Sequence, residues 1–305
     1  MVTVIQRIIV TVIAGLLAFT SFSAQAKIRV FACEPEWGSL IEELAGDQAK
    51  VFVATTAQQD PHHIEARPSL IAKMRRADIA VCSGAELETG WLPLLLRSSG
   101  NKKVQINQPG YFEAASFVNR LEIPTVIDRS LGDIHASGNP HVHLDPHRLL
   151  IIAAALSKRL GEIDSGAANH YQQRYDDFSK RWQAATEQWQ QRAASLRGAE
   201  AIVHHRDWSY LFSWLGIKEV AQLEPKPGVP PSAAHLAKLK QQLANSPPQF
   251  IIYGPHQSAK AANWLAKQTG SPALQLPYTV GGDKQANDLF SLFDVTLNKL
   301  LTTIP

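Results

Sequence analysis

Short apolar segments alternate with amphipathic segments through the first third of the chain. A short apolar run bounded by turn residues is typical of a buried strand, whereas an apolar position every three to four residues is typical of a helix. These patterns predict strands over residues 27–32, 50–55 and 78–82. They predict helices over residues 37–45, 70–76 and about 87–97, with Ser69 as the N-cap of the second helix. Strands that alternate with helices in this way predict a parallel α/β sheet.

The middle of the chain has a different pattern. Residues 149–196 are helical throughout, rich in Ala, Gln, Arg and Trp, with one interruption around 161–166. The second part, about 32 residues, would extend about 48 Å at 1.5 Å per residue. We therefore expect a backbone helix that connects two domains. The alternative is an ordinary pair of packed helices within one domain.

The strand and helix alternation then resumes to the end of the chain. The predicted strands are 199–203, 218–221, 250–253 and 273–276, and the predicted helices are 208–215, 232–245 with Ser232 as N-cap, 259–268 and 287–301. A chain of 305 residues is long enough for two domains. The predicted fold class is therefore α/β, with two parallel-sheet lobes (27–148 and 199–305) joined by the helical segment 149–198.

Residues 1–26 have the pattern of a secretory signal peptide. Arg7 is the one charged residue, an apolar stretch covers 8–19, and Ala24-Gln25-Ala26 is a small-x-small cleavage site. We expect cleavage after Ala26 and export to an oxidising compartment, the periplasm. The alternative is an uncleaved N-terminal anchor.

Charge and cysteine content exclude several classes of protein. The formal net charge is +3, and the basic residues form no run longer than a pair, so we expect no nucleic-acid partner. Two cysteines exclude a disulfide-dense scaffold and a four-cysteine zinc site. Cys33 and Cys82 end the first and third predicted strands, which are neighbours in a sheet of order 2-1-3. This spacing predicts a disulfide bond; two thiolates near a binding site are the alternative.

The eleven histidines are more informative than the charge. Several lie in loops at or near the carboxyl ends of predicted strands, where parallel sheets bind their ligands. They form three groups, Asp60-Pro61-His62-His63, Asn139-Pro140-His141-Val142-His143, and His204-His205. Imidazole nitrogens suit borderline metals such as Zn²⁺, which takes three or four such ligands. His135 lies near the second group, and the other isolated histidines are expected to be solvated.

The three groups together resemble the motifs of one family, the cluster A-I periplasmic substrate-binding proteins of zinc and manganese ABC importers. The family motifs D-P-H-x-x-E-x-x-P-S, P-H-x-W-x-D-P and H-x-x-[FW]-x-Y are matched by DPHHIEARPS at 60–69, PHVHLDP at 140–146 and HRDWSY at 205–210. The resemblance covers nearly the whole mature chain, long helix included. It implies that His62, His141 and His205 are metal ligands in a cleft between the lobes.

The fourth ligand of the family is a carboxylate near the end of the last strand. Asp283 is the nearest acidic residue here, following Gly281-Gly282. The alternatives are Glu224, His63, His143 (which stands where the family has an aromatic residue) and a water molecule. Residues 112–138 contain one histidine, so we expect no long metal-scavenging loop.

The resemblance implies a solute-binding protein, not an enzyme, that captures Zn²⁺ and delivers it to an inner-membrane ABC permease. A manganese-binding protein of the same class is the nearest alternative, although three imidazoles favour zinc over the harder Mn²⁺. A secreted zinc hydrolase is less compatible, because HExxH and GxSxG motifs are absent from the sequence. A binder of an organic metal chelate would use arginine and aromatic residues in a wide cleft. We expect the protein to be a monomer.

Overall fold

The first lobe contains a four-stranded parallel sheet. A computed structural model describes residues 26–125 and 135–303, so the predicted signal peptide lies outside the described residues except for Ala26. The strands are β1 (Ile28–Ala32), β2 (Ala49–Val53), β3 (Ile79–Cys82) and β4 (Tyr111–Glu113), in the order β2-β1-β3-β4. Helices α2 (Pro35–Ala45), α3 (Pro68–Arg76) and α4 (Leu92–Ser99) connect them. The sequence predicted the first three strands and their order.

The second lobe repeats this plan. Its strands are β5 (Glu200–Val203), β6 (Lys218–Gln222), β7 (Phe250–Tyr253) and β8 (Ala273–Gln275), all parallel in the order β6-β5-β7-β8. Its helices are α7 (Ser209–Leu215), α8 (Ala233–Gln242), α9 (Ala259–Thr269) and α10 (Leu289–Leu301). The side chain of Ser232 accepts a hydrogen bond from the backbone N–H of His235, so the predicted cap of α8 is confirmed.

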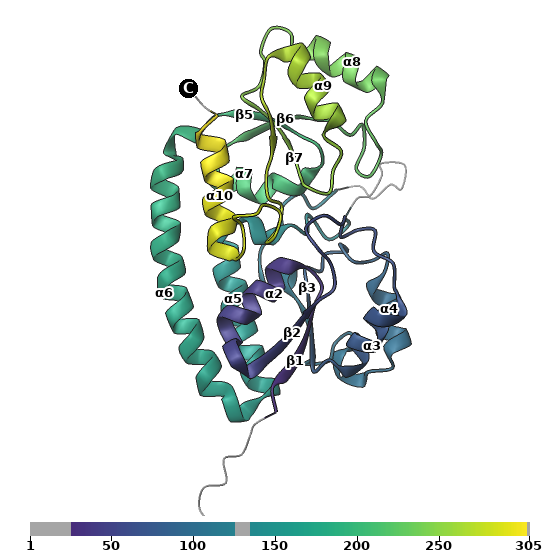
Figure 1. The fold of residues 1–305 in the computed structure, drawn as a ribbon, viewed down its shortest axis with the longest axis vertical. Coiled ribbons are helices and arrows are strands. Elements are labelled where there is room, and N and C mark those ends of the chain that lie inside the picture. Colours follow the sequence, from purple (N-terminus) through teal and green to yellow (C-terminus); the bar gives the residue numbers. More distant parts are fainter. Residues whose placement is uncertain (1–25, 126–134, 304–305) are drawn as a thin grey trace, which may run out of the picture.

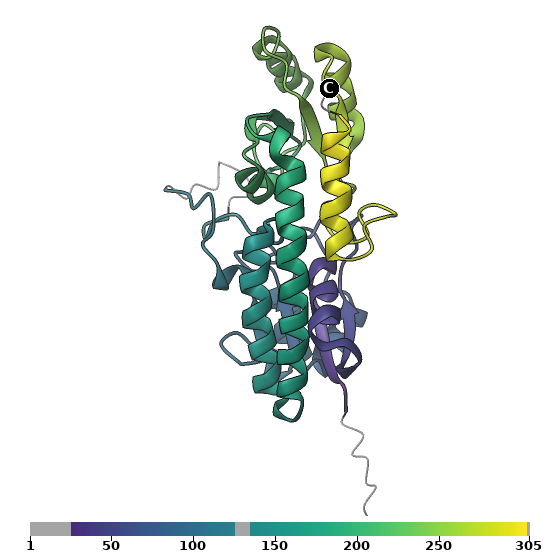
Figure 2. The same cartoon turned by 90° about the vertical axis from the view of Figure 1, so that its left-hand side faces the viewer.

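Two long helices join the lobes. Helix α5 (Pro146–Ile163) leads through a short 3₁₀ turn into α6 (Ala168–Arg192), which runs along one side of the molecule (Figures 1 and 2). The 25 residues of α6 extend about 37 Å, less than expected, because residues 165–167 and 193–196 are 3₁₀ turns. Among the described residues, each helix is too short or too polar to cross a bilayer.

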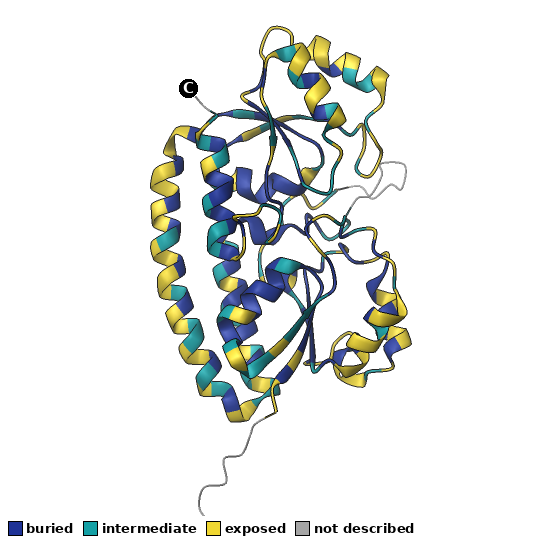
Figure 3. Ribbon diagram, in the orientation of Figure 1, coloured by how far each residue is buried: buried dark blue, intermediate teal, exposed yellow. Residues whose placement is uncertain are grey.

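One face of α6 is buried and the opposite face is exposed (Figure 3). The indole of Trp182 donates a hydrogen bond to the carbonyl of Pro146 at the start of α5. The indole ring of Trp189 stacks on Phe293 of α10, with ring centroids 4.9 Å apart. These large side chains belong to one apolar core that includes residues of both sheets. Since truncating a buried ring of this kind to alanine costs about 3–5 kcal/mol, this packing holds both lobes firmly against α6.

Two helix starts differ from the sequence prediction. Helix α3 begins at Pro68 with Arg67 as its N-cap, so Ser69 is not the cap; the fixed φ of proline suits the first helical position. Helix α4 begins at Leu92 instead of about residue 87. The chain enters the left-handed region at Gly84, Ala85 and Glu86, with φ of 73°, 48° and 71°, and so forms a turn before the helix.

Cys33 and Cys82 form a disulfide bond, as predicted from the strand order. Their Cα atoms are 4.8 Å apart. Cys33 directly follows β1 and Cys82 ends β3, and these two strands are hydrogen-bonded neighbours. Both residues are fully buried, so the bond ties the centre of the first sheet together at its carboxyl edge.

Candidate metal centre

The carboxyl ends of the strands of both sheets supply the histidines of one cluster. His62 lies in the loop after β2, and His205 lies two residues after the end of β5. His141 lies between β4 and α5. These loops lie at the carboxyl edges of the two sheets, which is where parallel sheets bind ligands. Side chains from both lobes therefore meet in the space between them.

The structure brings together His62, His141 and His205, the three residues that the sequence analysis named as metal ligands. Each offers one ligand atom, and these atoms lie within 4.8 Å of one another. Their ring centroids are 5.5 to 6.2 Å apart. The side chains are 13%, 1% and 11% exposed respectively, so the cluster is largely removed from bulk water.

The first two histidines are positioned by the same local turn. In Asp60-Pro61-His62, the Asp60 carboxylate accepts the backbone N–H of His62 at 3.0 Å. In Asn139-Pro140-His141, the Asn139 amide oxygen accepts the backbone N–H of His141, also at 3.0 Å. An Asx side chain that accepts from the residue two positions later closes a turn, and the proline between them restricts φ. The local sequence thus fixes the backbone position from which each imidazole extends.

A partner on Nδ1 orients each of the three rings. His62 Nδ1 lies 2.8 Å from Asp60 Oδ1, and His205 Nδ1 lies 2.8 Å from Glu224 Oε2. His141 Nδ1 lies 2.8 Å from the hydroxyl of Tyr278, which follows β8. When Nδ1 carries the proton, Nε2 is left with a free lone pair, as in metal-binding histidines. His141 Nε2 has no hydrogen-bond partner within the described residues.

Carboxylates give the cluster a field that favours cations. Burial disfavours charge on His205, but Asp207 and the hydrogen bond with Glu224 raise its pKa to about 9. Burial opposes ionisation of Asp60, yet the hydrogen bond with His62 lowers the pKa of this carboxyl below its usual range. Burial lowers the pKa of His141 well below its ordinary value, and so keeps its ring neutral. The site therefore combines the neutral ring of His141 with carboxylates whose negative charge favours a cation.

The structure does not bring Asp283 to this cluster. Its carboxylate pairs with Lys299 of α10 at 2.8 Å and accepts the backbone N–H of Gln285. Asp283 is absent from the group of converging ligand atoms. The expected fourth ligand is therefore engaged elsewhere, because α10 places a lysine beside the loop that follows Tyr278.

The alternative fourth ligands also have other roles. Glu224 is the partner of His205 Nδ1. His143 is fully buried, with Nε2 3.0 Å from the carbonyl of Tyr278 and Nδ1 3.2 Å from a carboxylate oxygen of Glu36. His63 is exposed beside His62. Asp145, in the second motif, caps α5 by accepting the backbone N–H groups of His147 and Arg148.

The sequence interpretation missed a fourth imidazole. His135 Nε2 lies 3.1 Å from His62 Nε2, with ring centroids 5.2 Å apart, and its ring centroid is 6.3 Å from that of His141. Its one signal in the sequence was its position six residues before His141. A single histidine in a loop has no periodicity or motif from which its placement can be inferred.

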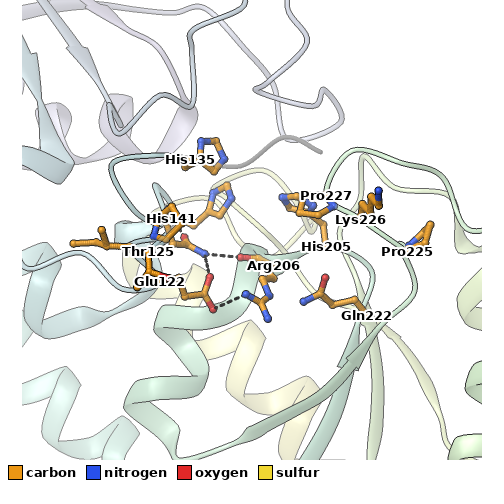
Figure 4. A pocket seen from close by; sticks show the side chains of 13 residues that line it. Glu122, Thr125, His135, His141, His205, Arg206, Gln222, Pro225, Lys226 and Pro227 are labelled. Carbon is orange, nitrogen blue, oxygen red and sulfur yellow. Dashed lines mark hydrogen bonds and ion pairs between the residues drawn. The ribbon is translucent and has the colours of Figure 1, made fainter. Parts of the chain in front are cut away.

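Two cavities meet at the cluster. One, of about 600 Å³, is lined by His135, His141 and His205, and Figure 4 shows these three side chains around it. The other, of about 300 Å³, is lined by His62, His205 and the carboxylates of Asp60, Asp207 and Glu224, among others. An ion therefore has space on either side of the imidazoles.

Comparisons with known proteins agree with this arrangement. A family model described as zinc-uptake complex component A, periplasmic, matches residues 30–303. The chain is 27% identical over 237 residues to the zinc-binding lipoprotein AdcA of Streptococcus pneumoniae, covering 75% of this chain and 45% of that protein. It is 25% identical over 258 residues to the high-affinity zinc uptake system protein ZnuA of Bacillus subtilis, covering 81% and 77%.

Solved structures share the fold. A crystal structure of ZnuA superposes with a TM-score of 0.76 at 20% identity, covering 91% of this chain and 99% of the other. A manganese-bound periplasmic metal-binding protein from Candidatus Liberibacter asiaticus gives 0.74 at 18% identity, covering 91% and 99%. The two-lobe architecture is thus shared with binding proteins whose names refer to different metals. The chain spans about half the length of the streptococcal relative and most of the Bacillus relative.

Proposed function

The chain belongs to the family of periplasmic zinc-uptake component A proteins, and on this premise we propose that it captures Zn²⁺ between its lobes and delivers the ion to an ABC permease in the inner membrane. One observation carries the proposal: His62, His141 and His205 direct ligand atoms to one point from three loops of two sheets. Each ring also has a partner at Nδ1, so Nε2 is the nitrogen that can bind the ion.

The chemistry of this donor set favours zinc. Zn–N bonds of 2.0–2.1 Å in a tetrahedron place the nitrogens about 3.3–3.4 Å apart. The ligand atoms here lie within 4.8 Å of one another, so a closing movement of about 1.5 Å or less completes the site. Manganese prefers carboxylate oxygens, whereas the converging ligand atoms are three imidazole nitrogens; of the nearby carboxylates, Asp60 and Glu224 are occupied by Nδ1 groups, and Asp207 lies beside His141. Zn²⁺ is therefore the cargo that we propose, and Mn²⁺ is the competitor.

The ion is cargo in this proposal, not a catalytic cofactor. Capture needs a closed set of protein ligands, while a catalytic zinc keeps an open position for water or substrate. The ligands come from the two lobes that we propose, residues 27–148 and 199–305, supported by the helical segment between them. We further propose that the protein acts as a monomer in the periplasm, after cleavage behind Ala26.

Titration calorimetry of purified protein tests the proposal. We expect His62→Ala, His141→Ala and His205→Ala each to weaken zinc binding at least tenfold, about 1.4 kcal/mol, because each removes one nitrogen donor. His147→Ala is the matched control, since this histidine is exposed at the start of α5. Wild-type affinity in any two of the three variants would overturn the ligand assignment. Metal analysis of protein purified without added metal then identifies the ion that is carried.

A further inference from the structure

His135 and His62 face one another through nitrogen atoms. The two Nε2 atoms are 3.1 Å apart. That separation is close to the edge of about 3.3–3.4 Å between two nitrogens of a tetrahedral zinc site. This pair therefore has nearly the spacing that a shared zinc ion requires. His135 is not in the group whose ligand atoms all lie within 4.8 Å of one another, so its ring must move closer to His141 or His205 when an ion binds.

The position of the proton on the His62 ring determines what its Nε2 atom offers to His135. His62 Nδ1 is beside the Asp60 carboxylate, which only accepts, so Nδ1 carries a proton. The neutral His62 ring therefore directs its Nε2 lone pair toward His135 Nε2, 3.1 Å away, where it can accept a hydrogen bond from His135 or, in its place, bind a cation.

A strained turn in the first lobe holds His135 in place. Ala85 and Glu86 have φ of 48° and 71°, in the left-handed region that residues other than glycine seldom adopt. The Glu86 carboxylate accepts the backbone N–H of Ala136 at 2.6 Å and the hydroxyl of Ser137 at 3.2 Å. Strained backbone of this kind persists where surrounding contacts maintain it, and it is concentrated at binding sites.

The same segment is fixed from two further sides. The guanidinium of Arg120 donates to the carbonyl of Ser137 at 2.5 Å. The backbone N–H of Asn139, which begins the turn into His141, donates to the carbonyl of Leu121. His135 therefore begins a short segment that is held by hydrogen bonds and that leads directly to His141, a proposed ligand.

We propose that His135 is the fourth ligand, so that four imidazoles bind the ion. This inference rests on the proposed function. His135 then takes the ligand position that was expected for Asp283. In the other three rings Nδ1 is held by a partner, which leaves Nε2 to face the ion, and His135 contributes the Nε2 atom that already faces His62. The three partners are the Asp60 carboxylate, the Glu224 carboxylate and the Tyr278 hydroxyl. Four nitrogen donors with no bound carboxylate select borderline ions such as Zn²⁺ and Co²⁺ over Mn²⁺.

Asp207 is the competing fourth ligand. Its Oδ1 atom lies 3.5 Å from His141 Nε2, and its Oδ2 atom accepts a hydrogen bond from the side chain of Gln257. The Asp207 side chain is 2% exposed, so its negative charge also balances that of a bound cation without direct contact. The experiment must therefore compare His135 with Asp207.

Zinc K-edge X-ray absorption and titration calorimetry with Zn²⁺ decide the question. We expect four imidazole nitrogens around zinc in the wild type and three in His135→Ala, with affinity reduced at least tenfold. His135→Gln should lose the same affinity while keeping the bulk of the side chain, and His147→Ala should behave as the wild type. Thermal melts of the metal-free variants establish that each is folded.

The outcomes separate this inference from the proposed function. Wild-type affinity and an unchanged nitrogen count in His135→Ala would overturn the inference, provided His141→Ala still loses binding. Three imidazoles and one oxygen in the wild type, with the oxygen lost in Asp207→Asn, would assign the fourth position to Asp207 instead. Absence of zinc binding by the wild-type protein would overturn the proposed function itself.

Discussion

The carboxylate of Asp60 accepts two hydrogen bonds from His62, one from its backbone N–H at 3.0 Å and one from Nδ1 of its ring at 2.8 Å. A single side chain thus closes the loop and orients the ring that the loop carries. In the second motif these tasks are divided. Asn139 closes the turn, and the hydroxyl of Tyr278, from the other lobe, contacts the His141 ring. The first ligand is therefore set within its own lobe, whereas the second depends on contact between lobes.

This difference makes Asp60→Asn an informative variant. Asparagine preserves the turn, as Asn139 does for His141, but it removes the negative charge beside the ring. We expect zinc affinity to fall about 10–100-fold, the usual effect of losing the partner of a ligating histidine. Calorimetry with Asp176→Asn on α6 as control, a remote and exposed site with the same charge change, measures it. Equal affinities in the two variants would show that the Asp60 charge does not support the ligand.

The three proposed ligands could be inferred from the sequence because their placement is local. His62 and His205 follow predicted strands, and His62 and His141 lie in Asx-Pro-His turns whose geometry is set by adjacent residues. The order of strands in each sheet then brings the loops together. Connections between parallel strands obey few topologies, so this step also requires little information beyond the strand pattern.

The fourth position could not be inferred, since it depends on contacts between residues far apart in the chain. Asp283 is the acidic residue nearest to the end of the last strand, where the family has its carboxylate, but Lys299 on α10 pairs with it. His135 is placed by Glu86, 50 residues away from Ala136, through a turn with positive φ in residues other than glycine. The same turn explains why α4 begins later than its apolar pattern indicates.

The pairing of Asp283 with Lys299 leads to a second prediction. Because the carboxylate does not reach the imidazole cluster, Asp283→Ala should leave zinc affinity within about threefold of wild type. The Lys299 hydrogen bond lowers the pKa of Asp283, but the pair is partly exposed, so its loss should cost no more than about 1 kcal/mol of unfolding free energy. Calorimetry and urea denaturation test the two parts separately. A tenfold loss of affinity would return Asp283 to the ligand set.

A third prediction concerns stability at low pH, away from the site. Asp78 is paired with Arg29 and Lys103 at 3.0 and 2.8 Å. Burial opposes its ionisation, but the hydrogen bonds with these two partners lower its pKa to about 2, from 3.8. A carboxyl with a depressed folded-state pKa stabilises the fold above its unfolded pKa and loses this effect as pH falls through the folded pKa. The contribution of Asp78 should therefore be present above about pH 4 and be nearly gone at pH 2.

Asp78→Asn tests this window. We expect the variant to be less stable than wild type by about 1–2 kcal/mol at pH 7, a value reduced for the exposure of Arg29 and Lys103. About half of the difference should remain at pH 3. Urea denaturation of both proteins at several pH values between 3 and 7 measures it. A difference that grows as the pH falls would have the wrong sign for this mechanism.

The last prediction concerns the bond between Cys33 and Cys82. It closes a loop with a sequence separation of 49 residues, and the chain-entropy model assigns about 4 kcal/mol to a loop of this length. Denatured, unreduced protein should contain no free thiol. The double variant Cys33→Ala/Cys82→Ala should unfold at a lower urea concentration, and alanine avoids the buried hydroxyls that serine would introduce. Because both cysteines are fully buried between β1 and β3, part of any loss will come from the two removed sulfur atoms. Reduced wild type separates the two effects: if it is as stable as the oxidised protein, the bond itself contributes nothing.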